Sequence, residues 1–258
     1  MEIRNVAGGV PEPEELIGRD HLIAYVWEQL AGNNIYLIAP RRFGKTGVMH
    51  HLVKRHQADY LPVYLDVEDL HDPDGFVAAL IASLLEQSEL RALICGIRSF
   101  PKTVLSFFKE QIGRVKTDLF EVELREVVKD AWESVAKTLL VEMEKAEKTV
   151  LFTLDEFPQF IDNLARKHGD DPARRFLQWF RALRMSRKDV LRRNRFVIAG
   201  STSLDIVLRR LDAPDKLNDF FRVPVEPISA EHADRLLDSL CARYGLRLSV
   251  RAGGRCGS

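Results

Sequence analysis

The loop at residues 39–46 constrains the fold of this chain more than any other feature. It reads Ala-Pro-Arg-Arg-Phe-Gly-Lys-Thr, follows the apolar run Ile-Tyr-Leu-Ile and precedes a stretch with helical spacing. Backbone N–H groups at such a turn and at the helix N-terminus surround a phosphate, while the lysine adds positive charge and the hydroxyl binds Mg²⁺. Gly44, Lys45 and Thr46 occupy the expected positions, and Ala39 stands where a glycine is usual. The sequence therefore predicts a strand, a phosphate-binding loop and a helix in succession.

The alanine at position 39 is compatible with this loop under one condition. Ala39 fits the turn if its backbone φ angle is negative. A strict left-handed requirement would cost a residue with a Cβ atom roughly 1 kcal/mol.

A second motif, around residue 150, complements the loop. The apolar run Val150–Leu154 ends in Asp155 and Glu156. Two carboxylates at the end of a buried strand repel each other and lose solvation unless a cation lies nearby. Mg²⁺ with ATP supplies that charge, so that the first acid holds the metal and the second polarises an attacking water. The alternative is a strand that merely reaches the surface at an acidic turn, but the order of loop, helices and acid pair favours a nucleotide site.

Apolar runs alternate with amphipathic stretches along the chain. Strand-like runs occupy 35–39, 63–67, 149–154 and 196–200, and helical spacing occupies 21–30, 47–56, 73–87, 103–115, 119–148 as one helix or two, and 172–187. Such alternation predicts an α/β fold, a doubly wound parallel sheet with helices on both faces, as in P-loop NTPases. We expect residues 1–228 to form this ATPase core. Residues 229–258, with helical spacing up to 243, are expected to begin a helical lid that is cut short.

Composition and charge exclude several classes of protein. Lys+Arg and Asp+Glu each number 38, so no global charge attracts nucleic acid or an anionic membrane. No apolar stretch approaches the roughly 18–20 residues of a spanning helix, and the N-terminus lacks the layout of a secretory signal. The three cysteines are too few and too scattered for a disulfide framework or a metal site. We expect a cytoplasmic protein that makes no membrane contact.

The two motifs assign roles to individual residues. Lys45 is expected to bridge the β- and γ-phosphates, Thr46 and Asp155 to serve Mg²⁺, and Glu156 to act as the base or to position the water. Lys45 and Glu156 are therefore the first two predicted catalytic residues. The residues of the loop expected to contact the nucleotide are Pro40, Arg41, Arg42, Phe43, Gly44, Lys45, Thr46 and Gly47.

Polar residues after the last strand-like run extend the predicted site. Ser201 and Thr202 follow that run, where a side chain could reach the γ-phosphate or the attacking water. The alternative is a Ser/Thr cap for a helix that begins near Leu204. Both interpretations remain open for the sequence, and Ser201 is included in the predicted catalytic set.

Arginines in the C-terminal half raise two further hypotheses. Arg209, Arg210 and Arg222 could bring positive charge to a phosphate of this or a neighbouring subunit, although most arginines are solvated surface residues. Arg222 is included in the predicted catalytic set. A basic group could also bind nucleic acid or a partner, but no aromatic or groove-reading motif accompanies it, which favours a solvated surface. That group comprises Arg184, Arg187, Lys188, Arg192, Arg193 and Arg195.

Taken together, the motifs resemble those of the archaeal-type ATPase family, P-loop ATPases related to the AAA+ and STAND groups. The matching segments are the loop at 39–46, Ile17-Gly18-Arg19-Asp20, Leu154-Asp155-Glu156-Phe157 and Ala199-Gly200-Ser201-Thr202, and the resemblance covers roughly residues 14–245. It implies that Ile17, Gly18 and Arg19 bind the nucleotide near the adenine, whereas the residues alone indicate a turn leading into a helix. It also implies a lid and a winged-helix domain. Because this chain carries only the start of the lid, DNA binding through a winged helix is not expected here.

Two functions of different classes follow. The first is an ATP-binding, Mg²⁺-dependent ATPase that acts as a switch or motor, coupled to a protein or DNA partner or to assembly into a homo-oligomer. The second is a nucleotide-gated module that binds DNA or protein and hydrolyses little ATP. Glu156 favours the first. A small-molecule kinase is a weaker alternative, because the acid pair suits water activation and no acceptor-binding signature is visible. The absence of an Asn-Lys-x-Asp motif favours ATP over GTP.

Overall fold

A five-stranded parallel sheet lies at the centre of the computed structural model, which describes residues 12–111, 118–185, 193–201 and 203–245. The strand order is β2-β3-β4-β1-β5, and every neighbouring pair is parallel. The strands are β1 (Asn34–Ile38), β2 (Tyr60–Asp66), β3 (Thr149–Asp155), β4 (Arg195–Ile198) and β5 (Phe220–Pro224). The predicted parallel α/β architecture is therefore confirmed.

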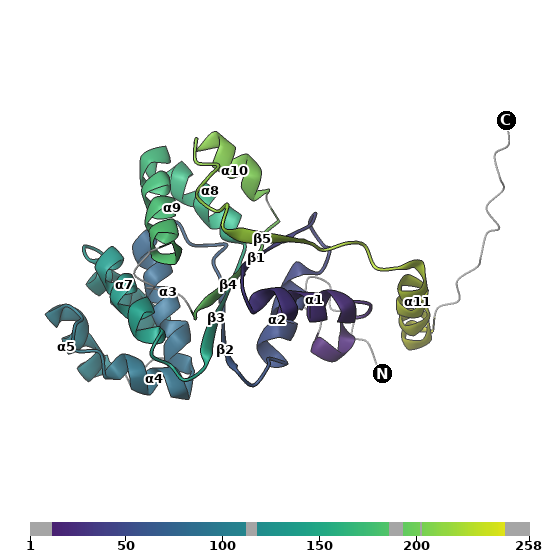
Figure 1. Ribbon diagram of the computed structural model, residues 1–258, viewed down its shortest axis with the longest axis horizontal. Coiled ribbons are helices and arrows are strands. Elements are labelled where there is room, and N and C mark those ends of the chain that lie inside the picture. Colours follow the sequence, from purple (N-terminus) through teal and green to yellow (C-terminus); the bar gives the residue numbers. More distant parts are fainter. Residues whose placement is uncertain (1–11, 112–117, 186–192, 202, 246–258) are drawn as a thin grey trace.

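Helices cover both faces of the sheet (Figure 1). On one face α1 (Asp20–Leu30) and α2 (Lys45–Lys54) bury apolar side chains against β1, β4 and β5. On the other face a larger core includes α3 (Pro73–Glu86), α8 (Phe157–His168) and α9 (Asp170–Arg184), whose aromatic rings pack against one another. The remaining helices are η1 (Pro13–Glu15), α4 (Ser88–Cys95), α5 (Lys102–Gln111), α6 (Asp118–Val128), α7 (Trp132–Met143), α10 (Leu204–Arg210) and α11 (Ala230–Tyr244).

The stretch at 119–148 resolves into two helices, α6 and α7, separated by a turn at residues 129–131. The backbone N–H of Ala131 donates to the carbonyl of Val128 at 2.9 Å, which ends α6. The apolar stripe continues across the turn because both helices contribute to the same core. Periodicity alone could not locate this break.

Three elements escape the sequence pattern. Helix α8 begins directly after Glu156 and carries Pro158 in its first turn, where proline is tolerated because the N–H there has no helical partner. Strand β5 ends in Pro224 at the edge of the sheet, a position in which a strand tolerates proline. Helix α4 is short and follows α3 after the single residue Gln87. The sequence pattern did not predict α8 and β5 because each contains a proline, and it did not predict α4 because that helix is short.

Strand order determines which loops meet at the carboxyl edge. Strand β4 lies between β1, which leads into the phosphate loop, and β3, which ends in Asp155. The chain leaving β4 stays against β3, because the N–H of Ala199 donates to the carbonyl of Leu154 and the N–H of Phe157 donates to the carbonyl of Ala199. Residues that follow β4 therefore lie between the loop and the acid pair.

Helix α11 lies apart from the sheet at the end of an extended connector, residues 225–229 (Figure 1). None of its described side chains is buried. Ser229 caps the helix by accepting a hydrogen bond from the N–H of His232. The helix expected at the start of residues 229–258 is thus present, while residues 246–258 lie outside the described part of the chain, as do 1–11. The division into a core and a lid stays a prediction.

Candidate nucleotide-binding site

The loop between β1 and α2 has the backbone geometry of an anion-binding turn. Arg42 and Gly44 both take left-handed conformations, with φ angles of 66° and 85°. Alternation of right- and left-handed residues points successive N–H groups into one concavity, where they bind anions. Gly44 is also the N-cap of α2, so the helix N-terminus faces the same space. Ala39 is absent from the residues with positive φ, so the condition for an alanine in this turn is met.

Lys45 is held inside the loop. Its side chain is 6% exposed, and its Nζ donates to the carbonyls of Ala39 and Pro40 at 2.9 Å each. Burial lowers the pKa of Lys45, while Glu156 and Asp155 act in the opposite direction. A buried ammonium group with neutral partners is poorly compensated. A phosphate anion in this loop would therefore be stabilised by Lys45.

Thr46 and Asp155, the two predicted ligands of Mg²⁺, contact each other. Asp155 is 2% exposed; it accepts a hydrogen bond from the Thr46 side chain and another, at Oδ1, from the N–H of Glu156 at 3.0 Å. Its Oδ2 accepts a hydrogen bond from the hydroxyl of Tyr64 at 3.2 Å. Burial raises the pKa of Asp155, and these hydrogen bonds oppose that change. Burial also raises the pKa of Tyr64, so the phenol remains a donor.

This donor set fits Mg²⁺ only in the company of a nucleotide. Mg²⁺ prefers oxygen ligands and is usually bound by one or two carboxylates together with substrate phosphates and water. Thr46 and Asp155 supply a hydroxyl and a carboxylate. In the described part of the chain, no group of three or more His, Cys, Asp or Glu side chains could hold a metal by itself. The phosphates of a bound nucleotide would complete the coordination.

Glu156 is joined to Ser201 by two hydrogen bonds. Its Oε2 accepts from the backbone N–H of Ser201 at 2.8 Å and from the Ser201 hydroxyl at 2.9 Å. Glu156 has a φ angle of 54°, which is uncommon for a residue with a side chain and is typical of functional sites. The N-cap of α10 is Ser203, not Ser201, and Thr202 lies outside the described residues. The contacts therefore favour a role for Ser201 in the site over the helix-cap interpretation.

Gly200 permits the close approach of these two segments. A Cβ atom at this position would lie 2.4 Å from Cδ of Pro158 and 3.4 Å from Oε2 of Glu156. The first distance is far shorter than any normal contact between carbon atoms. A glycine is needed here because α8 starts directly against the end of β4.

The variant Gly200→Ala is expected to be less stable and slower in hydrolysis. The added methyl group must displace Pro158 and with it Glu156, and overpacking of this kind typically costs about 1–3 kcal/mol. For a chain of this size that lowers the melting temperature by roughly 2–4 °C for each kcal/mol. Thermal unfolding and phosphate release measure the two effects. Gly32→Ala is the matched control, because nothing lies within 4 Å of a Cβ there, and a Gly200→Ala variant as stable as the wild type would contradict the close approach.

The segment Ile17–Arg19 lies against both the loop and the connector. Arg19 is 7% exposed; its Nη2 donates to the carbonyl of Phe43 at 2.8 Å and its Nη1 donates to the carbonyl of Glu226. Gly18 has a φ angle of 69°, and a Cβ atom there would lie 2.8 Å from Cγ of His232 on α11. Arg19 also directly precedes α1, in agreement with a turn leading into a helix. The nucleotide-binding role implied by the resemblance stays a prediction for Ile17, Gly18 and Arg19.

The three candidate arginines have different surroundings. Arg222 lies in the middle of β5, beside Tyr36 of β1, and forms two hydrogen bonds to Asp205, of 2.9 and 2.6 Å. Arg210 pairs with Asp162. Arg209 is exposed, and its side chain has no hydrogen bond or ion pair among the described residues. The structure therefore does not bring Arg222 to the phosphate loop, and its predicted role stays untested.

The described members of the basic group, Arg184, Arg193 and Arg195, form contacts within the chain. Arg184 is buried, pairs with Asp219 at 2.8 Å and lies over the rings of Phe180 and Phe220. The side chain of Arg193 donates to the carbonyl of Glu147, and the side chain of Arg195 donates to the carbonyls of Leu30 and Ala31. These three residues hold the fold together and do not form a free basic surface. The others, Arg187, Lys188 and Arg192, lie outside the described residues.

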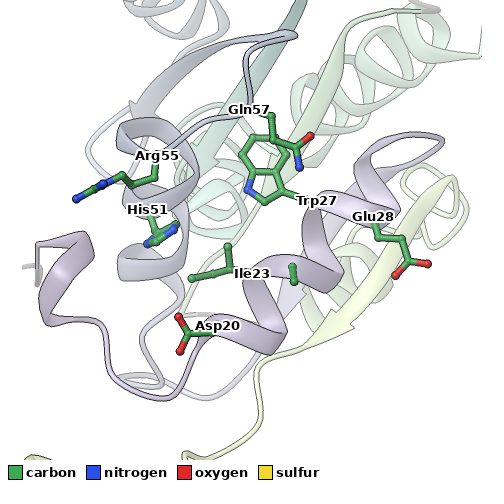
Figure 2. A pocket seen from close by; sticks show the side chains of 8 residues that line it. Asp20, Ile23, Trp27, Glu28, His51, Arg55 and Gln57 are labelled. Atoms are coloured by element: carbon green, nitrogen blue, oxygen red, sulfur yellow. The ribbon is translucent and has the colours of Figure 1, made fainter.

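Two hollows flank the elements that carry the loop. One, of about 370 Å³, opens beside the loop at the carboxyl ends of β1, β4 and β5, and Phe43, Ser201 and Glu226 line it. The other, of about 670 Å³, lies between α1 and α2, with Trp27 and His51 on opposite sides (Figure 2). Ligands of open α/β sheets bind at the carboxyl ends of the strands. The first hollow therefore belongs to the candidate site.

Two solved structures from Aeropyrum pernix are similar to this chain. The ORC1 protein in complex with DNA has a TM-score of 0.51 and 16% identity, over 88% of this chain and 50% of that one. The ORC2 protein (ADPNP-ADP complexes) has a TM-score of 0.52 and 13% identity, over 94% of this chain and 56% of that one. The chain shares a parallel α/β fold with these two structures. It spans about half the length of the two proteins, and at this identity the likeness concerns the fold alone.

Sequence comparison adds no further relative, since neither a protein-family model nor a curated protein matches the chain. In the described part of the chain, none of the helices is long and apolar enough to cross a membrane. Cys95 and Cys241 are both free, and Cys256 lies outside the described residues.

Proposed function

We propose that this chain binds ATP with Mg²⁺ and hydrolyses it, acting as a switch or motor coupled to a partner. The observation that carries the proposal is the meeting of three segments at one edge of the sheet. Lys45 and Thr46 follow β1, Asp155 ends β3 and precedes Glu156, and Ser201 follows β4 and binds Glu156. This combination of a cation, a metal-binding pair and an oriented carboxylate suits phosphoryl transfer to water.

Each residue has a defined part in the proposed reaction. The backbone N–H groups of the loop bind the phosphates, and Lys45 neutralises the charge that develops on them. Thr46 and Asp155 would hold Mg²⁺, which would supply further positive charge to the phosphate oxygens. Ser201 fixes Oε2 of Glu156, which leaves Oε1 to accept the proton of the attacking water. As the new P–O bond forms, the bond to ADP breaks and inorganic phosphate leaves.

The alternative is a nucleotide-gated module that binds DNA or protein and hydrolyses little ATP. The DNA bound by the similar ORC1 protein favours this alternative, although that likeness concerns the fold. The partner of this chain would then be DNA or a protein.

One experiment separates these functions. The purified chain is incubated with ATP, with Mg²⁺ or with a chelator, and both its melting temperature and the release of phosphate are measured. Stabilisation by ATP with Mg²⁺-dependent phosphate release supports the ATPase. Stabilisation without turnover above buffer supports the binding module, and no response to ATP overturns both. Release without any acceptor present counts against a kinase.

Assembly into a homo-oligomer would bring a neighbour's arginine to the phosphates. Of the three candidates, Arg209 is the one whose side chain has no hydrogen bond or ion pair among the described residues, whereas Arg222 would first have to leave Asp205. Phosphate release per chain that rises with protein concentration would support such assembly. A rate per chain that does not change with concentration would count against it.

A further inference from the structure

The carboxylate of Asp155 is held from the neighbouring strand as well as from its own. The hydroxyl of Tyr64 donates to Oδ2 at 3.2 Å, while Oδ1 is occupied by the N–H of Glu156. Tyr64 lies on β2, beside Thr153 of β3, so its side chain starts two residues before the acid it contacts. Without this contact, only the Thr46 side chain and the N–H of Glu156 would limit rotation of the carboxylate group, and the terminal torsion of aspartate is broad.

Helix α2 supports the same pair of residues. Thr46 and His50 are four residues apart and so share one face of the helix. Thr46 donates to Asp155, and the ring of His50 packs edge-on against Tyr64, with 4.5 Å between the ring centroids. The next residue, His51, points elsewhere, into the hollow between α1 and α2 (Figure 2). The helix that begins in the phosphate loop therefore contacts both the acid and the tyrosine that holds it.

We propose that Tyr64 is a positioning residue for Mg²⁺: it fixes the carboxylate of Asp155, and His50 fixes the ring of Tyr64. This proposal rests on the proposed binding of ATP with Mg²⁺. Groups that hydrogen-bond metal ligands orient them, and their loss typically lowers metal affinity about 10–100-fold. Tyr64 would thus set how much Mg²⁺ the site requires, without touching the nucleotide.

The variant Tyr64→Phe tests the proposal through binding. A fluorescent ATP analogue is bound first in chelator and then with increasing Mg²⁺, under conditions where hydrolysis is not measured. We expect wild-type affinity for the metal-free analogue, a wild-type melting temperature, and a half-saturating Mg²⁺ concentration raised about 10–100-fold. Tyr60→Phe is the matched control, since Tyr60 lies on the same strand but packs against Trp27.

The outcomes distinguish this proposal from the function on which it rests. If Mg²⁺ does not strengthen binding of the ATP analogue to the wild-type chain, the role of Tyr64 and the proposed binding of ATP with Mg²⁺ are both overturned. If Mg²⁺ strengthens binding of the analogue equally for Tyr64→Phe and the wild type, only the role of Tyr64 is overturned. A Tyr64→Phe variant that loses metal-free affinity to the same extent has a general structural defect, which also overturns the role. We expect His50→Ala to raise the Mg²⁺ requirement and His50→Phe, which keeps the ring contact, to restore it.

Discussion

Replacing Glu156 with glutamine is expected to lower the rate of ATP hydrolysis by about 10²–10⁴-fold, the usual contribution of a general base. The affinity for ATP should stay close to that of the wild type, because glutamine has the same shape and its amide oxygen can still accept the N–H and hydroxyl of Ser201. The amide cannot accept a proton from water. Phosphate release under single-turnover conditions and binding of a fluorescent ATP analogue measure the two quantities.

Glu28→Gln provides the control for this substitution, since Glu28 is exposed on α1 and remote from the acid pair. Unchanged phosphate release in Glu156→Gln would remove Glu156 from the mechanism. Loss of ATP affinity would point instead to a structural part for Glu156, which starts α8 in a left-handed conformation.

Replacing Lys45 with methionine is expected to weaken ATP binding by at least about 10–100-fold. Hydrogen bonds to charged groups contribute about 1.5–3 kcal/mol, and 1.4 kcal/mol corresponds to a factor of ten in affinity. Methionine keeps the unbranched shape and fills the buried space, so the change acts mainly on charge. The stabilisation of the chain by ATP should fall accordingly, and the rise in melting temperature at a fixed ATP concentration measures it.

Lys54→Met is the matched control, because Lys54 lies on the same helix but is exposed and pairs with Glu12. ATP should stabilise this variant as it does the wild type. Full stabilisation of Lys45→Met by ATP would contradict the binding of phosphate by the loop, whatever the outcome for Glu156.

The loop and the acid pair were predictable because each motif is contiguous in sequence. Gly44, Lys45 and Thr46 need only their own turn and helix, and Asp155 needs only the apolar strand before it. Neither motif depends on knowing where the other strands lie. Local pattern was therefore sufficient for the two halves of the candidate site.

The contacts between those halves were not predictable in the same way. Ser201 binds Glu156 because β4 lies between β1 and β3, and strand order is a property of the whole sheet. Tyr64 resembles any tyrosine of a half-buried strand until β2 is placed beside β3. The close packing at Gly200 likewise involves Pro158, in a helix whose early proline concealed it.

The guanidinium of Arg19 has a consequence for where the folding unit ends. It joins the carbonyl of Phe43 to the carbonyl of Glu226, and Glu226 lies 207 residues after Arg19. A chain shortened to end at Pro224 would keep all five strands and yet leave one side of a buried cation without its acceptor. An unsatisfied buried group of this kind costs about 1–3 kcal/mol, or more when charged. Arg19, near the N-terminus, therefore sets the C-terminal limit of the smallest unit that can fold by itself. That unit includes the connector, although the connector has no regular secondary structure.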